Sequence, residues 1–241
     1  MVRVDDITVC KGKKEIIRNI SFDLHPGKIV VVVGKNGAGK TTLLEALTGG
    51  NVLQKGQIQW DEQALSTLNL KELAIRRAVL TQNVQVNFPI VVKALVGMGA
   101  YVAPQFIPKT KIDRLIQHAL EEVEMYDFKD RIFMNLSGGE QKRVLLAKCI
   151  VQLNCCHWAD IPKYLFLDEP TASLDIQQQY RLIDLIKRWV QRRNIGVFAV
   201  LHDLNIAAQF ADEIIMLNEG VIAERGRPEA VFTPNKLKQY C

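Results

Sequence analysis

Eight consecutive residues, Gly34 to Thr41, read Gly-Lys-Asn-Gly-Ala-Gly-Lys-Thr, a pattern that suits the binding of phosphate groups. The glycines let backbone N–H groups curl around an anion, and the start of a helix adds the positive end of its dipole. Lys40 can reach the β- and γ-phosphates of a nucleotide, and the Thr41 hydroxyl can bind Mg²⁺. The alternative, a glycine-rich turn without a ligand, is disfavoured by the apolar run before the loop and the helical stretch after it. The predicted phosphate-binding residues are Gly34, Lys35, Asn36, Gly37, Ala38, Gly39, Lys40, Thr41 and Thr42.

Two adjacent carboxylates, Asp168 and Glu169, end an apolar stretch that begins at Tyr164. Ligands bind at the C-terminal ends of strands in open α/β sheets, so a pair at this place is positioned for chemistry. We expect Asp168 to hold Mg²⁺, directly or through water, and Glu169 to point the other way and act on a water as general base. An ordinary acidic strand end is the alternative, and the phosphate loop earlier in the chain favours the chemical role.

A second candidate anion site lies at Leu136-Ser137-Gly138-Gly139-Glu140, which opens an expected helix. A serine, two glycines and a helix N-terminus together can bind an anion. In isolation such a string is more often a capped helix after a Gly-Gly turn. Because the chain has two glycine-rich helix N-termini that could each bind an anion, we favour a binding role for this one.

These candidate residues must be positioned by alternating strands and helices. Runs such as Ile29–Val33 are continuously apolar, which suits strands buried on both faces of a sheet. Between about residues 88 and 150 the pattern becomes helical, so we expect an α/β core with a helical insertion. The expected strands are 2–9, 16–24, 29–33, 57–60, 78–81, 164–167, 196–201, 214–217 and 221–223, and the expected helices are 41–47, 112–123, 140–151 and 176–190.

Composition limits the class of protein. The 241 residues are 48% hydrophobic and 24% charged, which excludes a disordered chain, a collagen and a coiled coil. The net charge of +5 is spread along the chain and does not indicate nucleic acid. The odd number of cysteines and the absence of a signal-peptide pattern predict a reducing, cytoplasmic location. Stretch 78–108 has one charge, Lys93, but its prolines and amides argue against a membrane span.

Along the chain the phosphate loop at 34–41 comes first, the string 136–140 second and the strand ending in Asp168-Glu169 third. In this order the three motifs resemble the ATP-binding subunit of ABC transporters over essentially the whole chain. The resemblance implies an α/β fold: a P-loop NTPase core with a mixed sheet, an N-terminal antiparallel β subdomain and an inserted α-helical subdomain. It divides the single ABC ATPase domain 1–241 into a nucleotide-binding core, 1–86 and 153–241, and a helical subdomain with the signature motif, 87–152.

Further site residues follow only from this resemblance. Gln82 matches the glutamine that binds Mg²⁺ and links the nucleotide to the membrane partner, and His202 matches the histidine that contacts the γ-phosphate. Asp175, with Ser173 and Leu174, matches the loop that lies at the partner copy. In the implied mechanism two copies pack head to tail, and each ATP lies between the P-loop of one copy and the signature of the other. The resemblance also implies transmembrane permease subunits, indirectly a substrate-binding protein, no nucleic acid, and a peripheral place on the cytoplasmic face of the inner membrane.

Several strings narrow the resemblance to the ATPases of hemin importers. They are residues 76–82, the triplet 87–89, the switch region 202–208 and a long spacing between Ser137 and Asp168, with an extension at 152–162. Cys155-Cys156-His157 in this extension is expected to form a solvent-exposed loop rather than a metal site. One departure is that residues 9–12 offer no aromatic side chain to stack on adenine, so no residue is assigned to that contact.

Alternatives remain open at this point. The same switch string occurs in ATPases of iron-siderophore and cobalamin importers. A soluble ABC protein acting on nucleic acid or ribosomes, and a P-loop kinase, are further alternatives, against which the single ATPase domain and the signature argue. The uncharged stretch 83–108 is expected to pack on the permease, for example through Phe88 and Val92, or to form the core of the helical subdomain.

Overall fold

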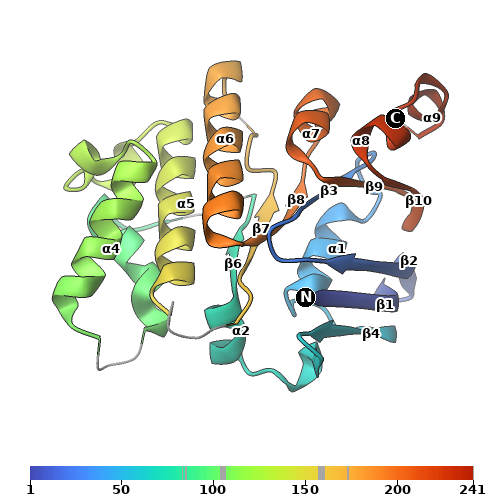
Figure 1. Ribbon diagram of the computed structural model, residues 1–241, viewed down its shortest axis with the longest axis horizontal. Coiled ribbons are helices and arrows are strands. Elements are labelled where there is room, and N and C mark those ends of the chain that lie inside the picture. The colour runs from blue at the N-terminus through green and yellow to red at the C-terminus, as the bar shows by residue number, and fades with distance from the viewer. Residues whose placement is uncertain (83, 85, 104–106, 157–160, 173, 241) are drawn as a thin grey trace.

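A computed structural model describes residues 1–240 apart from 83, 85, 104–106, 157–160 and 173. Figure 1 shows the strands gathered on one side and a group of helices, α3 to α5, on the other. Among the described residues, the strands are β1 (Val2–Lys11), β2 (Lys14–Leu24), β3 (Ile29–Val33), β4 (Lys55–Trp60), β5 (Gln63–Ala64), β6 (Arg77–Leu80), β7 (Tyr164–Asp168), β8 (Gly196–Val200), β9 (Glu213–Asn218) and β10 (Val221–Gly226). The α-helices are α1 (Lys40–Leu47), α2 (Leu70–Arg76), α3 (Val92–Gly97), α4 (Lys109–Glu122), α5 (Gly138–Asn154), α6 (Ile176–Arg193), α7 (Leu204–Phe210), α8 (Pro228–Val231) and α9 (Pro234–Tyr240). Short 3₁₀ helices are η1 (Leu65–Thr67), η2 (Met98–Val102), η3 (Tyr126–Phe128) and η4 (Phe133–Asn135).

The N-terminal strands form an antiparallel sheet in the order β2-β1-β4-β5. Along β1, Val2, Val4, Ile7 and Val9 are buried, and most residues between them face outward. One face of this sheet therefore packs on the interior, as the alternation in the sequence predicts.

The second sheet is mixed, with the order β10-β9-β3-β8-β7-β6, and only the pair β9–β10 is antiparallel. In β3, Val30 and Val32 belong to the core shared with the antiparallel sheet and α1, whereas Val31 and Val33 belong to the core on the helical side. Burial on both faces explains why these strands read as unbroken apolar runs.

Helices α3, α4 and α5 pack against one another and extend the helical-side core away from the sheet. Among the described helices none combines the length and the apolar character needed to cross a bilayer. The fold class predicted from the sequence is confirmed: a mixed-sheet α/β core, an N-terminal antiparallel sheet and a helical part. The boundaries at 87 and 152 stay a prediction, because one continuous core joins the helical part to the sheet.

One expectation for side chains is wrong. Cys155 and Cys156 are fully buried where α5 ends, with their sulfur atoms 3.7 Å apart, and do not lie in a solvent-exposed loop. Their thiols face the carbonyl oxygens of Gly99 and Val102 in η2, which covers the end of α5. His157 lies outside the described residues. For the stretch 83–108 two alternatives were open, and Val92, which is completely buried, follows the second, a place in the core.

Candidate functional site

The candidate residues come together at one edge of the mixed sheet. The loop 34–39 follows β3, Gln82 follows β6, Asp168 ends β7, and His202 follows β8. These strands are parallel and adjacent in the order β3-β8-β7-β6, so their C-terminal ends share one edge. This is the edge where open α/β sheets bind their ligands.

Three glycines of the loop, Gly34, Gly37 and Gly39, have positive φ values that other residues rarely adopt. Gly34 has a φ of 149° and Gly39 a φ of 103°. A Cβ on Gly34 would lie 2.1 Å from the carbonyl oxygen of Leu217, and one on Gly39 would lie 2.7 Å from a methyl group of Ile17. Gly39 is the N-cap of α1 and makes no side-chain cap, so the first N–H groups of the helix are left for a ligand.

The Lys40 ammonium lies inside the loop. The residue is 6% exposed, and its Nζ donates to the carbonyl oxygens of Gly34 at 2.8 Å and Lys35 at 3.0 Å. Burial lowers the pKa of Lys40, and the charges of Glu169 and Asp168 partly oppose this. The loop thus surrounds an ammonium group that has little contact with water and can bind a phosphate.

Asp168 and Thr41 face each other beside the loop. The Thr41 hydroxyl lies 3.5 Å from Oδ1 of Asp168, which is 4% exposed. Burial, and then the neighbouring Glu169 charge, raise the pKa of Asp168. Within the described residues no cluster of three or more His, Cys, Asp or Glu forms a metal cage. A carboxylate and a hydroxyl fit Mg²⁺, which usually takes few protein ligands and completes its shell with phosphate and water.

Glu169 has a left-handed backbone, with a φ of 50°. Its N–H donates to the carbonyl oxygen of Val200 at 3.1 Å, which holds this strained residue on β8. Its Oε2 accepts from the Gln82 amide at 2.6 Å, and its Oε1 pairs with Nε2 of His202. Gln82, Glu169 and His202 therefore form one connected group, whereas Asp168 contacts Thr41.

The string at 137–140 forms the start of α5 through a reciprocal cap. The Ser137 hydroxyl accepts from the N–H of Glu140 at 3.4 Å, and the Glu140 carboxylate accepts from the Ser137 N–H at 2.7 Å. These bonds from Ser137 lower the pKa of Glu140. Within the described chain the hydrogen bonds of Ser137 and Glu140 stay inside this cap, and none reaches the loop 34–42.

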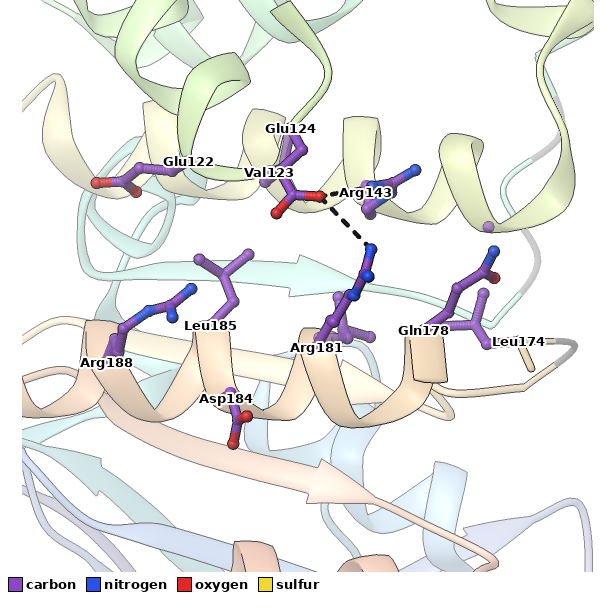
Figure 2. Close-up of a pocket in the computed structure, with 12 residues that line it drawn as sticks. Glu122, Val123, Glu124, Arg143, Leu174, Gln178, Arg181, Asp184, Leu185 and Arg188 are labelled. Carbon is purple, nitrogen blue, oxygen red and sulfur yellow. Dashed lines mark ion pairs between the residues drawn. The ribbon is translucent and has the colours of Figure 1, made fainter. Parts of the chain in front are cut away.

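Asp175 is the N-cap of α6 and accepts from the N–H of Gln178 at 2.8 Å. Ser173 lies outside the described residues. A groove of about 560 Å³ lies between the first turns of α5, the length of α6 as far as Arg188 and the end of α4, and has Gly139 among its lining residues. Figure 2 shows Glu124 reaching across this groove toward Arg143 of α5 and Arg181 of α6.

One residue of the site was missed by the sequence analysis. Lys142, in the second turn of α5, is half-buried, and its Nζ donates to the carbonyl oxygen of Gln82 at 2.9 Å. Burial lowers its pKa, and the charges of Asp168 and Glu169 oppose this. No local pattern marks this lysine, because its contact depends on how α5 lies against the loop after β6.

Comparison with known proteins gives consistent results. The family profile described as ABC transporter matches residues 17–172. The hemin import ATP-binding protein of Hahella chejuensis is 38% identical over 99% of this chain and 91% of its own length. The protein of the same name from Rhodopseudomonas palustris is 40% identical over 94% of this chain and 84% of its own length. Among solved structures, cbiO1 of Clostridium perfringens, part of the ABC transporter complex cbiONQ, superimposes with a TM-score of 0.85 at 24% identity, covering 99% of this chain and 92% of that one.

Proposed function

The chain belongs to the ABC transporter family, and from this premise we propose that it is the ATP-binding and ATP-hydrolysing subunit of a membrane importer for hemin. The observation that carries the ATPase assignment is the shared edge of the sheet: the phosphate loop, the buried Asp168 and the Glu169 group all lie there. Hemin is supported by relatives that are named for hemin import and align over nearly the whole chain.

Each residue has a distinct part in the proposed reaction. The loop N–H groups and Lys40 bind the β- and γ-phosphates, so that the γ-phosphate faces Glu169. Glu169 orients a water and takes its proton, and His202 donates a hydrogen bond to the γ-phosphate. Little covalent chemistry is required of the protein, because positioning and charge stabilisation supply most of the rate in phosphoryl transfer.

Thr41, Asp168 and Gln82 are the proposed ligands of Mg²⁺. The ion would neutralise charge on the β- and γ-phosphate oxygens when it is bound. In the present arrangement the amide nitrogen of Gln82 is used by Glu169. The metal would be held by the other end of this group, the amide oxygen of Gln82.

We further propose that the site is completed by a second copy of the chain. The cap at 137–140 presents a helix N-terminus, and in this chain its polar groups bind one another and not the loop 34–42. In a head-to-tail dimer this helix start meets the γ-phosphate bound to the other copy, and Asp175 lies near the same interface. Residues Ser137, Gly138, Gly139, Glu140 and Asp175 are then binding residues in trans.

The proposed membrane partner is a permease, with the chain bound at its cytoplasmic side and a substrate-binding protein acting from the far side. Two exposed apolar side chains of the segment predicted to dock support this proposal: Phe88 is 53% exposed and Tyr101 is 93% exposed. No nucleic acid is expected as a partner.

The substrate is tested by the ATPase activity of the complex with its native permease in vesicles. Hemin-loaded binding protein is compared with binding protein carrying a ferric siderophore or cobalamin, and the Glu169→Gln complex is the blank. We expect stimulation by hemin alone. Stimulation by a siderophore or cobalamin alone would replace the substrate and leave the ATPase assignment intact. A salt-sensitive response to RNA in place of any importer substrate would overturn the transport function.

A further inference from the structure

Lys142 contacts the same residue that contacts the proposed general base. Its Nζ donates to the backbone carbonyl of Gln82 at 2.9 Å, and the side-chain amide of Gln82 donates to Oε2 of Glu169 at 2.6 Å. Both ends of Gln82 are thereby fixed. A polar chain leads from the second turn of α5, the helix that carries the signature, to the carboxylate that acts on water.

This chain of contacts restrains Glu169. With His202 on Oε1 and Gln82 on Oε2, each oxygen of the carboxylate already has a partner. These partners compete with a water for the lone pairs of the carboxylate. Glu169 is best placed to take a proton from water after the Gln82 amide has left, and Lys142 opposes that movement by holding the Gln82 backbone.

The ion pairs of Glu124 beside the same part of α5 are weaker. Across the groove in Figure 2, Glu124 lies 3.6 Å from Arg143 and 3.9 Å from Arg181. The side chains of Glu124 and Arg181 are each 69% exposed, so these ion pairs contribute little. The Lys142 contact is shorter, the lysine residue is half-buried, and Asp168 and Glu169 attract the same ammonium.

We propose that Lys142 is a positioning residue that tethers Gln82 to Glu169 and so keeps hydrolysis slow until nucleotide and the partner copy move α5. The proposal rests on the ATPase function proposed above. It assigns a role to the second turn of the signature helix that is separate from phosphate binding at its N-terminus. Loss of the tether is expected to speed basal hydrolysis, because Gln82 then leaves Glu169 more easily.

The first test compares three variants of the full chain. Lys142→Met is expected to raise basal kcat about three- to tenfold, the effect of losing one partly exposed charged hydrogen bond, and to change KM less. Lys142→Arg keeps a cation that can reach the carbonyl, so it is expected to restore most of the restraint. Lys111→Met removes an exposed lysine of α4 and serves as the matched control with unchanged kcat.

A double-mutant cycle separates the tether from a merely structural effect. Gln82→Ala keeps the backbone carbonyl but removes the amide that contacts Glu169, so Lys142→Met added to it is expected to change kcat no further. If Lys142→Met leaves kcat unchanged or lowers it, or changes it equally in both backgrounds, the proposal is overturned.

A second readout needs no hydrolysis. In the nucleotide-free chain, hydrogen exchange of the peptide around Gln82 is expected to be faster in Lys142→Met than in Lys142→Arg or Lys111→Met. Equal exchange in all three would overturn the tether. If the unchanged chain hydrolyses no ATP under any condition, the proposed function fails, whereas the exchange experiment still decides whether Lys142 holds this loop.

Discussion

At the scale of single residues, Glu169 combines a strained backbone with two hydrogen-bond partners. Replacing it by glutamine keeps its size and removes its basicity. We expect Glu169→Gln to bind ATP normally and to lose about 10²- to 10⁴-fold in turnover, the usual contribution of a general base. Because bound ATP is no longer consumed, the variant should accumulate as an ATP-bound dimer in gel filtration.

The matched control is Glu229→Gln, which makes the same change at an exposed residue of α8 and should leave turnover unaltered. A Glu169→Gln chain with near-normal hydrolysis would show that another group activates the water.

Only some of the site residues can be predicted from the sequence alone. The phosphate loop and the Asp168-Glu169 pair can be predicted because their residue types and spacing indicate phosphate and metal binding. Gln82 and His202 have no local signal, and only a family resemblance selects them. Their contact with Glu169 arises because three parallel strands end side by side. Neither local spacing nor the family resemblance identified Lys142, because it donates to a backbone carbonyl of another segment.

At the scale of elements, two helices of the chain begin with the same reciprocal cap. Ser137 and Glu140 cap α5, and Asn69 and Glu72 cap α2. Replacing either cap residue by alanine should lower the free energy of unfolding by about 1 kcal/mol in urea titrations. Only Ser137→Ala should also reduce ATP-driven dimer formation, measured in the Glu169→Gln background. If Asn69→Ala reduced it equally, the effect would come from stability and not from binding in trans.

The cap of α5 also makes a prediction about pH. Hydrogen bonds from Ser137 hold the pKa of Glu140 below its ordinary value of 4.5. The ionised carboxylate therefore contributes stability above that ordinary value, and the contribution is lost as pH falls through the lowered pKa. The stability difference between the unchanged chain and Glu140→Gln should shrink as the pH is lowered from about 5 to about 3. A difference that stays constant over this range would contradict the role of the charge.

Helices and strands could be predicted from the sequence where all their residues, or one whole face, are buried. The strands β3, β7 and β8 are buried throughout and appear in the sequence as apolar runs. Helix α2 was not predicted, because only Leu73 of its seven residues is buried and no apolar period marks it. The buried pair Cys155 and Cys156 was misplaced because it follows the C-terminal end of α5, beyond the apolar pattern that predicted the helix.

At the scale of the whole molecule, the stretch 83–108 contains both exposed and buried apolar residues. Substitutions of the two kinds can distinguish an effect on docking from an effect on folding. We expect Phe88→Asp and Tyr101→Asp to weaken binding to the permease in pull-down experiments while the melting temperature stays close to that of the unchanged chain. Val92→Asp places a charge in the core, so it should unfold the protein. Normal transport with both exposed variants would remove this surface from the docking site.

The division of the site between a loop that binds phosphate and a helix start directed elsewhere has a consequence for the energy use of the cell. In the proposed dimer two chains meet for each turnover, so the rate per chain should fall on dilution below the dissociation constant of the dimer. A subunit that is made in excess, or has not yet found its permease, is then nearly silent. The membrane complex would hold two copies together and so raise their local concentration. ATP would then be consumed mainly where its hydrolysis can move a substrate.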